Sequence, residues 1–198
     1  MDPRRHRTRL RLEAALRTLL AEKPLAEISV EELSRRAGTT RQTFYGHFVG
    51  LPDMLEAYLD ALLAEIERRN AEIRCAPADE ADLQELHRRK FERVFRDLPR
   101  DDPRLRALLD GVPGLAPEDR FAELVEKLIG ATPENPYSSD PLMRRIAARF
   151  YTGAFVSVVR HWIGSADPLP PEAMARAFTT LIFRGWPDMA GAHERTTA

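Results

Sequence analysis

Apolar residues repeat at helical spacing along nearly the whole sequence, and this periodicity is the feature that most constrains the fold. Leu12, Ala15, Leu16, Leu19 and Leu20 fall at i, i+3, i+4, i+7 and i+8, so they form one stripe on a helix. Glycine and proline separate such segments, and no segment shows the sustained alternation that is typical of a strand. The sequence therefore predicts an all-α chain of about nine helices.

The helix breakers also set the expected boundaries of these helices. Helices are predicted at residues 5–22, 30–37, 41–47, 52–75, 80–98, 103–110, 117–130, 142–163 and 172–184. Residues 131–141 are rich in proline and are expected to form a loop. Residues 191–198 are expected to be a frayed tail.

Composition excludes several classes of protein. The chain has 198 residues, of which 43% are apolar, so it can bury a sizeable core. No apolar run approaches the roughly 18 residues of a membrane helix, and the N-terminus lacks the apolar segment of a secretory signal. The single cysteine, Cys75, can form neither an internal disulfide nor a zinc cluster, so a reducing, cytoplasmic location is expected.

The net charge of −1 hides an uneven distribution. Residues 1–50 carry 10 Lys and Arg against 6 Asp and Glu, whereas residues 51–198 carry 20 against 25. Cations oppose the helix dipole at a helix start, yet five arginines lie there: Arg4, Arg5, Arg7, Arg9 and Arg11. An external anion would explain them, so the basic head is a candidate nucleic-acid-binding region; an unevenly charged, solvated surface is the alternative.

Two short helices follow, joined by a tight turn. Ser29 and Glu32 have the spacing of a capping box at the start of the first. Gly38 is expected to end that helix in a left-handed conformation, and Thr40 is expected to cap the second helix, residues 41–47. This arrangement predicts a helix-turn-helix.

The second of these helices carries an unusually polar set of side chains. Phe44 and Phe48 are expected to anchor it to the core, which leaves the other sides to Arg41, Gln42, Thr43, Tyr45, Gly46 and His47. In a major groove Arg can pair with guanine, Gln with adenine, and the methyl group of Thr can contact thymine. Ser29 and Thr40, each at a helix N-terminus, are expected to meet phosphates.

The run of residues 28–38, followed by Arg-Gln-Thr-Phe-Tyr-Gly-His-Phe at 41–48, resembles the TetR family of transcriptional regulators. The resemblance covers residues 8–60, and residues 150–163 look like the eighth helix of one branch of that family. It implies a DNA-binding domain at 1–50 and a ligand-binding and dimerisation domain at 51–190. It also implies a homodimer on a palindromic double-stranded DNA operator, most members being repressors that a small-molecule effector releases.

By this similarity Arg41, Gln42 and Thr43 would face bases, Tyr45 and His47 would contact the backbone or flanking bases, and Thr40 and Ser29 would contact phosphate. Arg5 and Arg7 of the basic cluster are added to this set. Two positions depart from the family pattern: Leu51 stands where a phosphate-contacting Lys is usual, and Gly46 stands where a bulky or basic side chain is common. These departures leave open a second hypothesis, a helical coregulator whose DNA binding is weak or lost.

The body offers only general signals for a pocket and an interface. Aromatic residues are candidates for lining an effector pocket, although each could equally be a core residue: Phe91, Phe95, Phe121, Phe150, Tyr151, Phe155 and Trp162. Residues of the last two helices are candidates for a four-helix dimer interface: Val156, Val159, Ile163, Phe178, Leu181 and Ile182. The alternative interpretation is that these residues belong to the core of a monomer.

No catalytic motif is found in the sequence. It lacks a glycine-rich phosphate loop, Gly-x-Ser-x-Gly and His-Glu-x-x-His, and its histidines have no metal-ligand spacing. Cys75 is interpreted as a spare thiol. We therefore expect no enzymatic activity, no metal and no cofactor.

Overall fold

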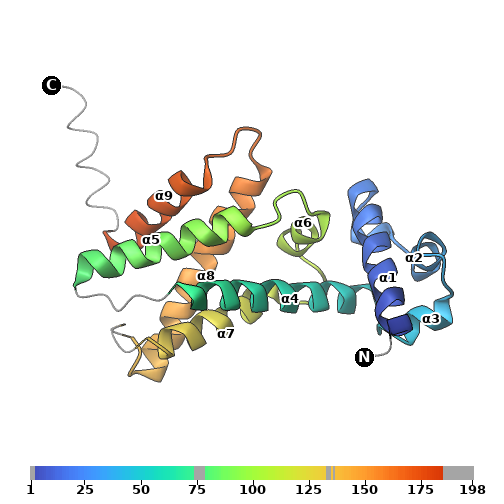
Figure 1. Ribbon diagram of the computed structural model, residues 1–198, viewed down its shortest axis with the longest axis horizontal. Helices are drawn as coiled ribbons and strands as arrows, with labels where there is room; N and C mark the ends of the chain where they lie inside the picture. The colour runs from blue at the N-terminus through green and yellow to red at the C-terminus, as the bar shows by residue number, and fades with distance from the viewer. Residues whose placement is uncertain (1–2, 74–78, 133–134, 136, 185–198) are drawn as a thin grey trace. The chain divides into compact units, whose positions relative to one another are not determined.

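The computed structural model describes residues 3–73, 79–132, 135 and 137–184. Every regular element within these residues is helical (Figure 1), which confirms the predicted all-α fold. The elements are α1 (Pro3–Glu22), η1 (Leu25–Glu27), α2 (Val30–Arg36), α3 (Arg41–Tyr45), α4 (Leu51–Glu72), α5 (Glu80–Asp97), α6 (Pro103–Asp110), α7 (Pro117–Gly130), α8 (Pro141–Gly164) and α9 (Pro171–Phe183). The predicted tail at 191–198 and Cys75 lie outside the described residues.

The chain divides into two compact units, and both are discontinuous in sequence. The first comprises Met1–Ala64 and Pro99–Ile163, which hold α1 to α3, most of α4, and α6 to α8. The second comprises Glu65–Leu98 and Gly164–Ala198, which hold the end of α4, α5 and α9. The predicted boundary at residue 50 separates a DNA-binding domain from a ligand-binding domain. It differs from the division into compact units, and it stays a prediction.

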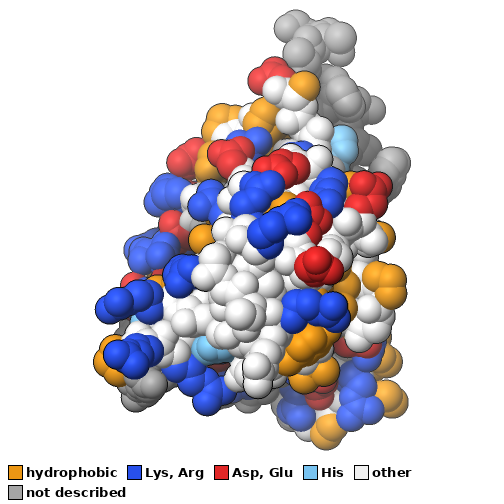
Figure 2. Space-filling view, turned by 90° about the vertical axis from the view of Figure 1, so that its right-hand side faces the viewer, with side chains coloured by type: hydrophobic (Ala, Val, Ile, Leu, Met, Phe, Trp, Pro, Cys, Tyr) orange, Lys and Arg blue, Asp and Glu red, His pale blue; other side chains and the backbone are white. Residues whose placement is uncertain are grey.

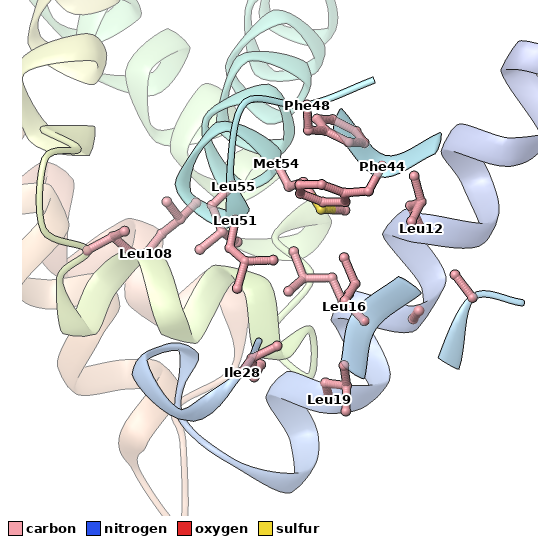
Figure 3. Close-up of a cluster of buried hydrophobic side chains, with 14 of the residues drawn as sticks. Leu12, Leu16, Leu19, Ile28, Phe44, Phe48, Leu51, Met54, Leu55 and Leu108 are labelled. Atoms are coloured by element: carbon pink, nitrogen blue, oxygen red, sulfur yellow. The ribbon is translucent and has the colours of Figure 1, made fainter. Parts of the chain in front are cut away.

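A single apolar core fixes the three-helix head to the start of α4 within the first unit (Figure 3). Leu12, Leu16 and Leu19 of α1 point into it from one stripe, as their spacing predicts. Leu108 of α6 reaches the same cluster, and α6 packs against α1. Side chains far apart in sequence therefore share the core that positions α2 and α3.

Helices α7 and α8 pack together farther along the first unit. The rings of Phe121 and Phe155 lie 5.4 Å apart between their centroids. Exposed ion pairs border this contact, including Arg149 with Asp119 at 2.7 Å. Pairs of this kind contribute little to stability in water, so the apolar contacts hold these helices together.

The second unit is built on the pairing of α5 with α9, which lie side by side in Figure 1. The ring of Phe178 meets that of Phe91 edge to face, with the centroids 4.8 Å apart. His87 lies against Phe183 at 5.2 Å, and burial lowers the pKa of its imidazole. Aromatic packing therefore provides much of the contact in this unit.

Candidate nucleic-acid interface

The turn between α2 and α3 has the geometry that its sequence predicts. Gly38 adopts a φ of +61°, in the left-handed region, and the amide of Thr39 donates to the carbonyl of Ser34 at 2.9 Å. The hydroxyl of Ser29 accepts a hydrogen bond from the amide of Glu32 at 3.1 Å. The capping box and the glycine stop are thus confirmed, and together they set the direction in which the chain enters α3.

Two anchors and one cap hold α3, which is too short to be stable alone. Phe44 and Phe48 are buried in the core beneath it. The hydroxyl of Thr40 accepts from the amide of Thr43 at 3.1 Å, as an N-cap does. The remaining side chains of α3 are therefore presented outward by tertiary packing.

Three side chains of α3 are exposed as their positions predict. Arg41 and Gln42 lie in its first turn, and Tyr45 is 53% exposed with its ring edge-on to Phe44. Thr43 is half-buried, and its hydroxyl lies 2.9 Å from that of Thr40. Guanidinium, amide and phenol groups are therefore available along one side of this helix.

His47 follows α3 and is half-buried beside the basic cluster. Burial lowers the pKa of its imidazole, and the positive charges of Arg5 and Arg9 lower that pKa further. The neutral imidazole is therefore favoured in the free protein at neutral pH.

The arginines of α1 do not all point the same way. Arg5 Nη2 donates to the carbonyl oxygen of Gly46 at 3.2 Å, and Arg11 Nη2 donates to that of Gly38 at 2.6 Å. Arg7 is exposed. Arg11 was absent from the predicted set of site residues, because the sequence does not show that its side chain reaches the turn before α3.

The two departures from the family pattern have different structural settings. Leu51 is the first residue of α4 and is buried in the core, so its side chain contributes to packing. Gly46 follows α3 with a φ of −73°, which any residue can adopt. A side chain at position 46 would have its Cβ 3.3 Å from the carbonyl oxygen of Thr43, a tight contact that a small local shift must relieve.

Lys and Arg side chains gather on this end of the first unit. Figure 2 looks at the side of the molecule that carries α1, α2 and α3, and blue side chains outnumber red ones there. This agrees with the excess of 10 Lys and Arg over 6 Asp and Glu in residues 1–50. Such a surface attracts a polyanion.

The candidate pocket aromatics fall into separate groups. Phe91 and Phe95 contact Phe178 in the second unit. Phe121 and Phe155 contact each other in the first unit. The predicted pocket as a whole therefore stays a prediction.

The other three candidates have three different environments in α8. Phe150 is 67% exposed, and its ring lies 5.6 Å from that of Tyr151, which is half-buried. Trp162 is buried, and the Arg100 guanidinium lies 4.5 Å from its ring centroid. The exposure of Phe150 makes it available to a partner surface.

Three of the candidate interface residues belong to the chain's own core. Val159, Ile163 and Phe178 are 3%, 7% and 3% exposed, so they pack within the chain's own core, and the prediction that they meet a partner stays a prediction. The other candidates are half-buried or exposed: Val156, Leu181 and Ile182. A different set of exposed apolar residues lies in the first half of α8: Leu142, Met143, Ile146 and Phe150.

The described residues hold no group of three or more His, Cys, Asp or Glu side chains that could bind a metal ion. Within the same residues, no helix is both long enough and apolar enough to cross a membrane.

The first unit contains a helix-turn-helix whose second helix is anchored by buried aromatic rings and lies on a basic surface. These features define the class of helix-turn-helix DNA-binding proteins. Comparison with known families makes this more specific. Residues 12–58 match the model described as bacterial regulatory proteins of the tetR family. Residues 85–184, about half of the chain, match the model described as transcriptional regulator C-terminal region. The chain belongs to the TetR family of transcriptional regulators, as its sequence motif predicts.

Solved structures share this fold over nearly their whole length. NalD of Pseudomonas aeruginosa, the secondary repressor of the MexAB-OprM multidrug efflux pump, is 17% identical with a TM-score of 0.66, covering 91% of this chain and 96% of its own. FadR of Bacillus halodurans, a fatty acid degradation regulator, is 17% identical with a TM-score of 0.60, covering 94% and 98%. AlkX of Dietzia sp., a TetR family repressor implicated in biodegradation of n-alkanes, is 19% identical with a TM-score of 0.56, covering 88% and 92%. No curated protein matches this sequence.

Proposed function

We propose that this regulator is a ligand-released repressor that binds a palindromic operator as a homodimer. The observation that carries the proposal is the geometry of α3, in which Phe44 is buried while Arg41 and Gln42 are exposed at the N-terminal end. That end is the part of a recognition helix that reaches base edges in a major groove. A two-fold dimer would place its two α3 helices at half-sites about 34–36 Å apart.

Each exposed polar group has a role in the proposed complex. Arg41 would pair with guanine and Gln42 with adenine, while the methyl group of Thr43 would contact thymine. Tyr45 and His47 would contact the backbone or flanking bases. The hydroxyls of Ser29 and Thr40 accept backbone hydrogen bonds. The Ser29 hydroxyl can still donate its proton to a phosphate, and that of Thr40 can do so when the Thr43 hydroxyl is the donor of their mutual hydrogen bond.

The dimer is supported by the apolar residues that α8 exposes. Ile146 and Phe150 lie one turn apart on the same face, are more than half exposed, and follow Leu142 along it. Contiguous exposed apolar side chains are characteristic of interfaces. The proposed partner is a second copy of this chain that meets α8 on this face.

Release by an effector is supported by one solved structure with the same fold. RolR, which shares the fold at 16% identity and a TM-score of 0.51, is described in complex with the ligand resorcinol. An effector bound in the body of this chain would favour a state whose two α3 helices no longer match adjacent major grooves. Its affinity for the two states must differ, because equal affinity shifts no population.

Selection from a randomised duplex library tests the proposal. The expected result is one enriched sequence with two-fold symmetry and half-site centres about 10 base pairs, or a multiple of this turn, apart. Enrichment of a single asymmetric half-site would contradict binding as a symmetric dimer. Absence of any enrichment by a folded protein would contradict the proposed operator recognition.

A coregulator with weak DNA binding is the second candidate. Two observations favour it: Gly46 offers no side chain to DNA, and Leu51 is buried in the core. The fold also occurs in DhaS, described as a dihydroxyacetone kinase operon activator, with 17% identity and a TM-score of 0.56. This candidate predicts a failed selection together with a folded, dimeric protein.

A further inference from the structure

We propose that Arg5 and Arg11 of α1 are positioning residues that hold the two ends of α3 at the angle required for base recognition. This inference rests on the proposed function, because it concerns how α3 is presented to DNA. It reassigns Arg5, whose position in the basic cluster predicts a phosphate contact. It also gives a role to Arg11, which the sequence motif leaves without one.

The need for such positioning follows from the length of α3. Its residues, Arg41–Tyr45, form little more than one turn, and a single turn is unstable without tertiary support. Phe44 and Phe48 fix α3 to the core, but both lie toward its C-terminal end. These two rings alone do not fix the tilt of so short a helix, so contacts to the backbone at each of its ends help to set that tilt.

Arg11 holds the chain immediately before α3. Its Nη2 donates to the carbonyl oxygen of Gly38 at 2.6 Å. A Cβ atom at position 38 would lie only 2.5 Å from the same nitrogen. The glycine therefore provides both the φ of +61° that the turn requires and the space that the guanidinium occupies.

Arg5 holds the other end of α3. Its Nη2 donates to the carbonyl oxygen of Gly46, the C-cap residue, where a cation also interacts favourably with the helix dipole. Arg9 lies one turn farther along α1, with its guanidinium 5.2 Å from the ring centroid of Phe48. Both arginines thus face the segment that carries the recognition side chains.

The helical period explains why Arg5 and Arg9 share one side of α1. They precede Leu12 and Leu16 at i, i+4, i+7 and i+11, so they lie in line with the buried leucines, although Arg5 is exposed and Arg9 is half-buried. Arg7 is two residues from Arg5, which places it about 200° around the helix. It is exposed there and provides a matched control with the same charge on the same helix.

A positioning arginine and a phosphate-binding arginine differ in what their removal changes. Loss of a phosphate contact weakens binding to all sequences alike and reduces the salt slope by about one charge. Loss of a positioning contact lets α3 tilt, which weakens binding to the selected site more than binding to a scrambled duplex. The number of phosphate contacts, and hence the salt slope, stays the same.

The test compares R5M, R11M and R7M with the wild type by fluorescence anisotropy on the selected and scrambled duplexes. R5M and R11M are each expected to reduce the ratio of the two affinities by about threefold to tenfold, with the salt slope unchanged. R7M is expected to keep the ratio. An R11M protein that keeps the ratio and loses about one unit of slope would overturn the inference and assign Arg11 to a phosphate.

Hydrogen exchange without DNA separates this inference from the proposed function. The amides of Phe44 and Phe48 donate within α3 and the turn after it, at 3.0 and 2.9 Å. Their exchange is expected to speed up in R5M and R11M and to stay unchanged in R7M. Unchanged exchange in all three would overturn the positioning role even if DNA binding were specific. If exchange is faster in R5M and R11M but the wild-type protein never binds DNA, the positioning role stands and only the proposed function is overturned.

The pairing of Arg11 with Gly38 gives a further check. In G38A the new methyl group displaces the guanidinium of Arg11. Adding R11M to G38A should therefore reduce the ratio of affinities for the selected and scrambled duplexes little further. Fully additive effects would contradict a shared contact.

Discussion

Arg41 is the side chain on which base recognition most depends at the residue scale. It is the first residue of α3, is exposed, and can form two hydrogen bonds with guanine. Arg41→Ala is expected to lose about 1–3 kcal/mol of binding free energy and to relax base preference at one position of each half-site. Affinity measured on single-base variants of the selected site checks this. The control is Arg89→Ala, which removes an exposed arginine of α5. An unchanged base preference in Arg41→Ala would refute the base-reading role.

Gly38 is the position at which an added methyl group is expected to be most damaging. Alanine there must adopt a left-handed conformation, which costs about 1–2 kcal/mol, and its Cβ also meets Arg11. Gly38→Ala should therefore lower the free energy of unfolding by at least this amount, as measured by urea denaturation. Gly46→Ala is the matched control, because its φ of −73° suits alanine and its Cβ would lie 3.3 Å from the nearest atom, a milder contact than the 2.5 Å at position 38. Equal losses in the two variants would contradict the account of the turn.

Tyr58 of α4 carries a buried hydroxyl for which the structure shows no hydrogen-bond partner. Burial, together with the negative charge of Asp102, raises the pKa of this phenol to about 12. Because the neutral form is favoured in the folded state, its contribution to stability is present below the ordinary pKa of about 10 and is lost as the pH rises toward 12. Tyr58→Phe should change the free energy of unfolding by less than about 1 kcal/mol and remove the tyrosinate absorbance step near pH 12. A loss well above that value would indicate a hidden partner of the hydroxyl.

At the scale of elements, α6 depends on a capped ion pair at its start. Asp102 accepts from the Arg104 amide at 3.0 Å and from its guanidinium at 2.7 Å, and this guanidinium stacks on the ring of Tyr58 at 4.2 Å. Burial acts to raise the pKa of Asp102, but the hydrogen bonds from Arg104 outweigh it and hold that pKa below its ordinary value. The ionised carboxylate therefore stabilises the fold.

The pH dependence of stability tests this pair. The contribution of Asp102 is complete above the unfolded-state pKa of about 3.9 and is lost as the pH falls through the lower, folded-state value. Asp102→Asn keeps a capping side chain but cannot ionise, so the stability difference between wild type and variant should shrink as the pH falls from about 6 to about 3. Denaturant unfolding at several pH values measures it. A difference that stays constant with pH would contradict the ion pair.

The sequence predicts the helices and the head well, because the signals involved are local. The capping box at Ser29, the left-handed Gly38 and the buried stripe through Leu12 each depend on residues close in sequence, and each is found in the structure. The faces of α8 are harder to assign from sequence, because that helix is apolar on several sides. Only tertiary packing decides that Val159 is buried while Phe150 is exposed. The contact of Arg11 with Gly38 is likewise long-range, because the two residues are 27 positions apart in sequence.

At the scale of the whole molecule, the proposed dimer makes a direct prediction about α8. Phe150 is the most exposed of the apolar residues in the first half of this helix. Phe150→Glu should place a charge in the proposed interface and give a monomer in sedimentation velocity, with a lower affinity for the full operator. Leu10→Glu, which alters an exposed apolar residue of α1, should stay dimeric. A Phe150→Glu protein that remains a dimer would remove this face of α8 from the interface.

The central claim is that the exposed side chains of α3 select a DNA sequence. The measurement that tests it most directly is the affinity of the purified protein for its selected site and for a scrambled duplex, at about 50 mM and about 200 mM salt. We predict binding as one dimer per site, an affinity at least about a thousandfold higher for the selected site, and a steep fall of both affinities with salt. Equal affinity for the two duplexes would show that the basic head binds DNA without reading it, which would contradict the account.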